Sequence, residues 1–219
     1  MIIVNLFFKL QCKTRAGSYQ DDFKKITHLL HHFCILPCMY ATTTNTIKQY
    51  QMKTRKLIIL GSSRSGGDTA KLTQKLKETC QWDLLDLNEY DITYFDYDHR
   101  NREDDFLPLM RKIIENYDVL ILATPVYWYT MSGIMKVFFD RISDLLTIEK
   151  DLGRQLRGKS MAVITASGGN DAGDNFWIPF KLSAEYLGMK YITQLHTFPP
   201  EIDEGELLRF VSEVERFDN

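Results

Sequence analysis

The 219-residue chain has few cysteines and no strong surplus of either charge. It contains 4 cysteines, and only Cys80 lies after residue 51, so no disulfide framework can hold that part of the chain together. The formal net charge of −2 gives no reason to expect nucleic acid or an acidic membrane surface as a partner. No apolar run approaches the roughly 18–20 residues that a membrane-spanning helix needs. These absences favour a globular protein of the reducing cytoplasm, with neither nucleic acid nor membrane as a partner.

The first 51 residues differ in composition from the rest. They carry 6 lysines and arginines against 2 acidic residues, whereas the remaining residues carry 21 against 27. Histidines and cysteines are concentrated between His28 and Cys38, but their spacing matches no zinc-binding pattern, so we predict no metal site. We predict that residues 1–51 are a disordered or loosely packed extension, and that residues 52–219 form a domain beginning near Met52.

From Lys56 onward, short apolar runs alternate with helical patterns. These patterns predict strands at 56–60, 82–87, 119–123, 161–165 and 191–197, and helices at 68–80, 105–117, 132–146, 177–187 and 206–217. Ser132 is placed to cap one helix and Gly188 to end another. Five strands alternating with five helices predict the α/β class, with a doubly wound five-stranded parallel sheet and helices on both faces.

Two segments carry more apolar and aromatic residues than this fold needs. Residues 88–105 are aromatic and acidic and too long for an ordinary loop, so we expect them to hold a short strand of their own and to cover something. The helix at 132–146 is apolar over more than one face, and the aromatics at 127–129 need cover. Because a surplus apolar face is usually buried by a partner, we predict a homo-oligomer, either a dimer or a tetramer.

The first strand ends in a loop of small and hydroxylated residues, GSSRSGGDT, at positions 61–69. Small residues let the backbone approach an anion, hydroxyl and amide groups donate hydrogen bonds, and the following helix N-terminus favours negative charge. Arg64 adds a guanidinium group that suits phosphate oxygens. No lysine follows the glycines as in a Walker A motif, and no G-x-G-x-x-G fingerprint is present. The loop therefore predicts a phosphate site of another kind, and the alternative is a plain turn with an exposed arginine.

Two further loops follow the third and fourth strands. The loop at 124–133 contains three consecutive aromatics, Tyr127 to Tyr129, which suit a flat ring system. The alternative is an aromatic cluster buried against a helix or another subunit. The loop at 165–170 is a third segment of small residues. Ligands bind outside the carboxyl ends of strands in open parallel sheets, so the three loops together predict one ligand site.

Other chemistries of this topology lack their residues. A response-regulator receiver needs acidic residues where Gly61 and Thr124 stand, and a small tyrosine phosphatase needs a cysteine in the first loop. Neither His99 nor His196 lies beside an identifiable nucleophile. We therefore expect no Ser–His–Asp set, and we interpret His196 as a surface or satisfied histidine.

Through GSSRSGGDT, ATPVYWYTMSGIMKVFFDR and TASGG, residues 53–217 resemble the NAD(P)H-dependent FMN reductases of the flavodoxin-like superfamily. The resemblance implies the strand order 2-1-3-4-5, with FMN at the switch between strands one and three. It implies FMN contacts at Ser62, Arg64, Ser65 and Thr69 for the phosphate, at Pro125, Val126, Tyr127, Trp128 and Gly133 for the isoalloxazine ring, and at Ala166, Ser167, Gly168 and Gly169 on the ring's other side. Many members have asparagine where this chain has Asp68, which we interpret as a helix N-cap.

The resemblance further implies an oxidoreductase in which NADH or NADPH reduces FMN and a quinone, flavin or nitro compound takes the electrons. We expect no catalytic side-chain acid or base, because backbone amides of the 125–133 loop would stabilise charge on the reduced ring. One alternative is an electron-transfer flavodoxin without NAD(P)H turnover, although such carriers are typically far more acidic. A second alternative is a non-catalytic FMN-binding module.

Overall fold

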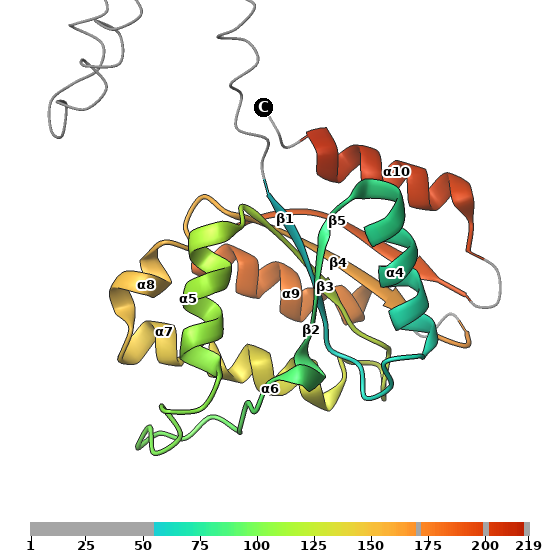
Figure 1. Ribbon diagram of the computed structural model, residues 1–219. Coiled ribbons are helices and arrows are strands. Elements are labelled where there is room, and N and C mark those ends of the chain that lie inside the picture. Colours follow the sequence, from blue (N-terminus) through green and yellow to red (C-terminus); the bar gives the residue numbers. More distant parts are fainter. Residues whose placement is uncertain (1–54, 170–171, 199–201, 217–219) are drawn as a thin grey trace, which may run out of the picture. The chain divides into compact units, whose positions relative to one another are not determined.

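The computed structural model describes residues 55–169, 172–198 and 202–216 (Figure 1). The predictions for residues 1–51, including the absence of a metal site and the boundary near Met52, lie outside these ranges. The described chain forms one sheet of five strands: β1 (Lys56–Leu60), β2 (Asp83–Asp86), β3 (Val119–Ala123), β4 (Ser160–Ala166) and β5 (Lys190–Thr197). All neighbouring strands are parallel, and their order is β2-β1-β3-β4-β5. The predicted fold class and strand order are confirmed.

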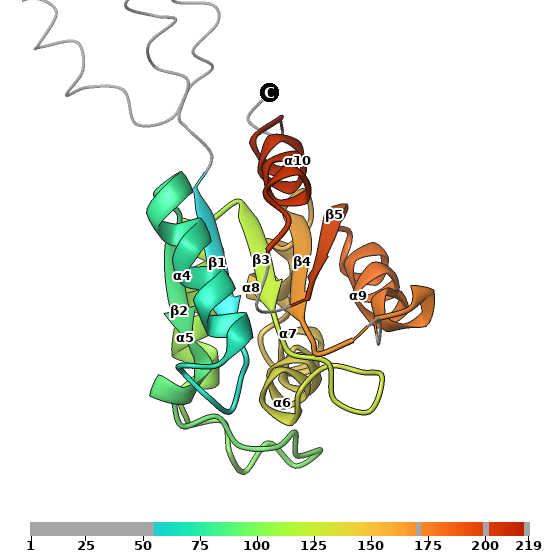
Figure 2. The same cartoon turned by 90° about the vertical axis from the view of Figure 1, so that its right-hand side faces the viewer.

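Helices cover both faces of the sheet (Figure 1, Figure 2). One face carries α4 (Asp68–Cys80) and α10 (Glu204–Glu215). The other carries α5 (Phe106–Asn116), α6 (Gly133–Arg141), α7 (Asp144–Thr147), α8 (Lys150–Arg154) and α9 (Asp174–Leu187). Along β1, Ile58 packs on the α4 side and Ile59 on the α5 side. The continuous apolar runs of the central strands therefore reflect burial on both faces.

Most predicted elements begin and end close to the observed ones. Gly188 ends α9 with a left-handed φ of 71°, as predicted, although α9 begins at Asp174 rather than Trp177. The short helix α8 was not predicted. None of the helices in the described ranges has the length and apolar character required to cross a membrane.

The predicted helix at 132–146 is broken into two. Ser132 caps α6 as predicted, because its Oγ accepts a hydrogen bond from the Met135 N–H at 3.1 Å. However, α6 ends at Arg141, and the N–H groups of Ile142 and Ser143 bond to carbonyls only three residues back. The prediction of one continuous helix is therefore wrong.

Most of the apolar surplus of this helix is covered within the chain, although Leu146 remains 40% exposed. The Phe139 ring lies 5.4 Å from that of Phe180 on α9, and the Phe138 ring lies 5.8 Å from that of Phe106 on α5. Met135 is also fully buried. This face therefore no longer argues for a partner copy.

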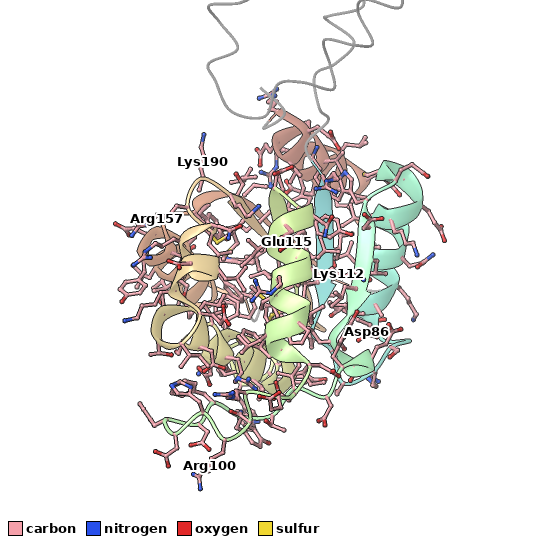
Figure 3. All side chains as sticks on the ribbon, turned by 60° about the vertical axis from the view of Figure 1, so that its left-hand side comes forward. Asp86, Arg100, Lys112, Glu115, Arg157 and Lys190 are labelled. Carbon is pink, nitrogen blue, oxygen red and sulfur yellow. The ribbon has the colours of Figure 1, made fainter. Side chains whose placement is uncertain are left out.

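Residues 88–105 contain no strand, so that expectation is wrong. Side-chain interactions take the place of a ladder of backbone hydrogen bonds. Arg141 is wholly buried and forms ion pairs with Asp104 and Asp144, and it donates to the Thr93 carbonyl at 3.0 Å. His99 Nδ1 lies 3.0 Å from Asp144 Oδ1. The stretch is thereby fixed to α6 and α7, while Arg100 points outward from it (Figure 3).

Candidate functional site

The N-terminus of α4 presents backbone donors at the end of the first loop. Its N-cap is Gly67, whose extended backbone offers no capping side chain. The interpretation of Asp68 as the N-cap is therefore wrong: it is the first helical residue, and its carboxylate pairs with Lys71 at 3.3 Å. The N–H groups of Asp68, Thr69 and Ala70 have no carbonyl acceptor among the described residues. A helix N-terminus whose first N–H groups have no carbonyl acceptor is a binding site for anions.

The side chains predicted to contact phosphate are in different situations. Ser62 is buried, and its Oγ donates to the Arg64 carbonyl at 3.3 Å, which shapes the loop. Thr69 is also buried. The Ser65 hydroxyl donates to Asp86 Oδ2 at 3.0 Å, so its proton is already engaged. Arg64 is exposed, and its guanidinium has no hydrogen-bond or ion-pair partner in the described part of the chain. Arg64 and the backbone of α4 are therefore the loop's main available donors.

Asn88 supports this loop, and sequence reasoning missed it. Its Nδ2 donates to the Ser62 carbonyl at 2.5 Å and to Asp86 Oδ1 at 2.8 Å. The available signal was its position two residues after β2, since β2 is the strand next to β1. Asn88 ties the first loop to the edge of the sheet.

Gly61 and Ser132 join the first loop to the second. Ser132 Oγ donates to the Gly61 carbonyl at 2.6 Å. A Cβ atom at Gly61 would lie 2.9 Å from the Cβ of Met135 and 3.1 Å from its Cα, so only glycine permits this approach of β1 to α6. The Ser63 and Tyr127 hydroxyls, 3.3 Å apart, make a second link.

The aromatic loop ends in a strained two-residue turn. Tyr127 and Thr130 exchange backbone hydrogen bonds of 2.9 and 3.1 Å, with Trp128 and Tyr129 between them at φ values of 50° and 63°. This is the type I′ geometry, which favours asparagine and glycine rather than aromatics. Trp128 is 93% exposed and Tyr129 73%, so neither belongs to an aromatic cluster buried within this chain. Backbone strain of this kind clusters at ligand clamps and active sites.

The turn decides which backbone amides of the second loop remain available. The N–H groups of Tyr127 and Thr130 serve the turn, and that of Ser132 donates to Thr124 Oγ1 at 2.9 Å. Within the described ranges, no acceptor is seen for five other N–H groups, those of Val126, Trp128, Tyr129, Met131 and Gly133. Pro125 is buried and contributes no donor. The predicted row of amide donors is thus reduced to these five.

The third loop is fixed by Ser167. Its N–H donates to the Thr197 carbonyl at 3.2 Å, its Oγ donates to the Gly169 carbonyl at 2.6 Å, and His196 Nε2 lies 2.7 Å from the same Oγ. His196 is half-buried and hydrogen-bonded, which agrees with its interpretation as a satisfied histidine. The expectation that no hydroxyl nucleophile lies beside it is wrong, because β5 brings it next to Ser167 from a distant part of the sequence. Ala166 is buried, Gly168 is exposed, and the N–H groups of Gly168 and Gly169 have no acceptor among the residues described.

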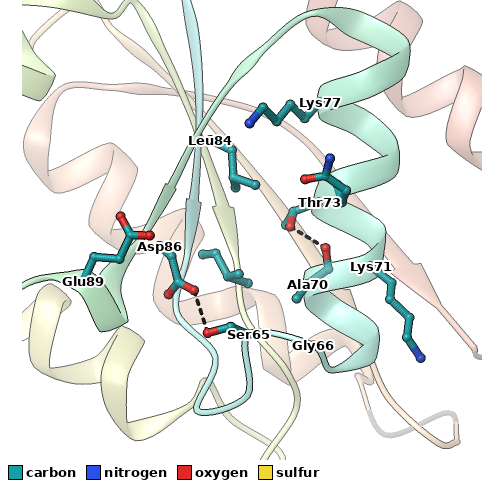
Figure 4. Close-up of a pocket in the computed structure, with 11 residues that line it drawn as sticks. Ser65, Gly66, Ala70, Lys71, Thr73, Lys77, Leu84, Asp86 and Glu89 are labelled. Carbon is teal, nitrogen blue, oxygen red and sulfur yellow. Dashed lines mark hydrogen bonds between the residues drawn. The ribbon is translucent and has the colours of Figure 1, made fainter.

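A cavity of about 420 Å³ lies on the outer side of the first loop, between α4 and β2 (Figure 4). Ser65 and Gly66 line one end, and Lys77 reaches over it. It lies on the β2 side of β1, whereas the second and third loops follow β3 and β4 on the opposite side of β1. Its charged lining combines Lys71 and Lys77 with Asp86 and Glu89. The cavity therefore borders the first loop but neither the second nor the third, and its charged lining favours neither sign.

The donors of the three loops suit a phosphate joined to a flat heterocycle. Arg64 and the α4 N-terminus match a phosphate dianion, and the amides of the second and third loops match the polar edge of a ring. A parallel sheet with such loops after β1, β3 and β4 defines a flavodoxin-like FMN-binding protein. The chain belongs to the NADPH-dependent FMN reductase family, whose family model matches residues 54–198. This family consists of oxidoreductases that use FMN together with NAD(P)H.

The chain is similar in sequence to one curated protein and in fold to several solved structures. The chain is 32% identical over 121 residues to YwqN of Bacillus subtilis (strain 168), named as a candidate NAD(P)H-dependent FMN-containing oxidoreductase. That match covers 52% of this chain and 66% of YwqN. The Trp repressor binding protein of Bacillus subtilis has a similar structure (TM-score 0.54, 24% identity, 75% of this chain and 96% of that one). So has an FMN-dependent NADH-azoreductase of Bacillus anthracis, solved with FMN (TM-score 0.51, 16% identity, 75% and 97%).

Proposed function

We propose that the protein is an FMN-dependent NAD(P)H oxidoreductase that passes electrons to a small acceptor such as a quinone, a flavin or a nitro compound. The observation that carries the proposal is the placement of three donor loops after β1, β3 and β4, all within the segment that the family model matches. FMN, when bound, would supply the redox chemistry by accepting hydride from the nicotinamide and releasing electrons to the acceptor.

The first loop would bind the phosphate. Arg64 can place two guanidinium N–H groups on phosphate oxygens, and the N–H groups of α4's first turn add donors whose dipoles favour the dianion. The buried side chain of Ser62 keeps the loop in shape through its bond to the Arg64 carbonyl, and Thr69 is buried in the first turn of α4. Ser65 would donate to phosphate only after leaving Asp86.

The second and third loops would hold the ring. Backbone amides aimed at the position where negative charge develops stabilise that charge without reorganisation. The amides of Val126 and Gly133, with those of Gly168 and Gly169, are available for this task. Tyr127 and Trp128 would border the space that the nicotinamide enters, with Pro125 and Ala166 as buried supports.

Steady-state kinetics with an acceptor panel tests this function. We expect the FMN-loaded protein to oxidise NADH or NADPH when a quinone, a flavin or a nitro compound is present. Both substrates would use one site in turn, so double-reciprocal plots should give parallel lines. Intersecting lines would contradict this order. Tight FMN binding without any NAD(P)H oxidation would instead support the flavodoxin-type carrier.

We further propose that the protein works in the cytoplasm as a homo-oligomer, a dimer or a tetramer. Support for a partner copy comes from α9, whose outer face exposes Ile178, Leu182 and Tyr186 at four-residue spacing. Such a stripe is the side of a helix that another surface covers. We also propose that residues 52–219 fold and bind FMN without residues 1–51.

A further inference from the structure

The third loop depends on a residue from a different strand. His196 lies near the end of β5, and its register partner on β4 is Thr165, two residues before Ser167. Ser167 is the first residue after β4, and its N–H donates to the carbonyl of Thr197, the residue after His196. The distance between His196 Nε2 and Ser167 Oγ is 2.7 Å. The His196 ring also contacts Phe198, with the ring centroids 4.3 Å apart.

The direction of these hydrogen bonds follows from counting protons. A serine hydroxyl has one proton to donate, and a carbonyl oxygen can only accept. Because Ser167 Oγ lies 2.6 Å from the Gly169 carbonyl, its proton serves that bond. The Ser167 oxygen must then accept from His196, which therefore carries a proton on Nε2.

This direction excludes a nucleophilic role for Ser167. A histidine that activates a serine accepts the hydroxyl proton, whereas here His196 donates. The hydrogen bonds from His196 to Ser167 and from Ser167 to Gly169 instead close a tight turn. Glycine loops lose much conformational freedom on ordering, so two hydrogen bonds that fix Gly168 and Gly169 in advance reduce the cost of binding a ligand there.

We propose that His196 is a positioning residue for FMN, which holds Ser167 on the Gly169 carbonyl and so leaves the N–H groups of Gly168 and Gly169 as donors to the flavin ring. The inference rests on the proposed function and adds a residue to its site. His196 acts through Ser167, so its effect should depend on the Ser167 hydroxyl.

A double-mutant cycle on FMN affinity tests this dependence. We expect His196→Ala and Ser167→Ala each to weaken FMN binding by about fivefold to tenfold, which corresponds to the usual free-energy contribution of one hydrogen bond. The double variant should bind no more weakly than the worse single variant. His196→Gln, whose side-chain amide also offers an N–H, should stay within about twofold of the wild type. Gln194→Ala, on the same strand and face, is the matched control and should leave the affinity unchanged.

A second readout is independent of FMN. In nitrogen-15 NMR spectra of the protein without FMN, His196 Nε2 should show the shift of a protonated ring nitrogen at neutral pH. An unprotonated Nε2, additive losses in the cycle, or unchanged affinity in His196→Ala would overturn the inference. If the wild-type protein does not bind FMN, the proposed function fails instead, and the two failures are thus distinguishable.

Discussion

Arg64 is the side chain on which the phosphate site depends most. It is the exposed cation of the first loop, and its guanidinium has no partner within the described chain. We expect Arg64→Ala to weaken FMN binding by about 1.5–3 kcal/mol, the range for a hydrogen bond to a charged group, in a fluorescence titration. Lys77→Ala, which removes a cation from the neighbouring cavity, should not change the affinity. Equal losses in both variants would indicate a general charge effect.

The strained backbone at Tyr129 predicts a substitution that stabilises the protein. Its φ of 63° is costly for an aromatic residue and free for glycine. Tyr129→Gly should therefore raise the free energy of unfolding by about 1 kcal/mol in urea denaturation. Tyr94→Gly is the control, since Tyr94 is similarly exposed but has no positive φ, and it should not stabilise the protein. A destabilised Tyr129→Gly variant would show that the turn is not strained.

Single residues were predictable where their partners are close in sequence. Ser132 is predictable as a cap because the N–H that donates to it, that of Met135, lies on the same turn of helix. The engagement of Ser65 by Asp86, the support from Asn88 and the bond from His196 all join segments that are distant in the sequence. Such pairs cannot be predicted from spacing in the sequence until the strand order is known.

At the scale of elements, α6 ends at a residue with a buried charge, Arg141. The apolar period continues past Arg141 to Leu146, which is why one long helix was predicted. The helix ends instead at Arg141, which forms buried ion pairs with Asp104 and Asp144. Burial opposes ionisation of Asp104, but hydrogen bonds from Arg141, Thr93 and the Phe106 N–H outweigh it and hold the pKa of Asp104 below its ordinary value of 3.8.

This lowered pKa predicts a loss of stability in acid. A carboxylate with a depressed pKa in the folded state stabilises the fold above its unfolded pKa, and the stabilisation disappears as the pH falls through the folded value. Asp104→Asn should therefore cost about 3–5 kcal/mol at neutral pH, because it leaves part of the Arg141 charge unpaired. Below a pH of about 3.8 the difference from the wild type should shrink. Asp98→Asn, at an exposed acid of the same stretch, should show neither effect in urea unfolding.

At the scale of the molecule, the sheet was predictable because five buried runs alternate with five helical patterns. Its order came from family resemblance, since alternation alone does not set which strands are neighbours. Of the two sequence features that predict assembly, the apolar face of 132–146 is mostly covered by α5 and α9, whereas Trp128 and Tyr129 are exposed. The exposed stripe of α9 was not foreseen, because a pattern with apolar residues on several faces does not show which face meets the sheet.

The α9 stripe gives a direct test of assembly. Leu182→Glu should convert an oligomer into a monomer in light scattering, because it places a charge in the middle of the apolar face. Leu208→Glu, at an exposed leucine of α10, should leave the mass unchanged. A wild-type protein that is already monomeric at micromolar concentration would contradict the proposal.

The central claim is that the loops after β1, β3 and β4 hold FMN for reduction by a nicotinamide. Its most direct measurement is an anaerobic titration of the FMN-loaded protein with NADH and NADPH, followed by the visible absorbance of the bound flavin. We expect one FMN per chain and loss of that absorbance with at least one of the two nucleotides. A protein that takes up no FMN, or bound FMN that neither nucleotide bleaches, would contradict it.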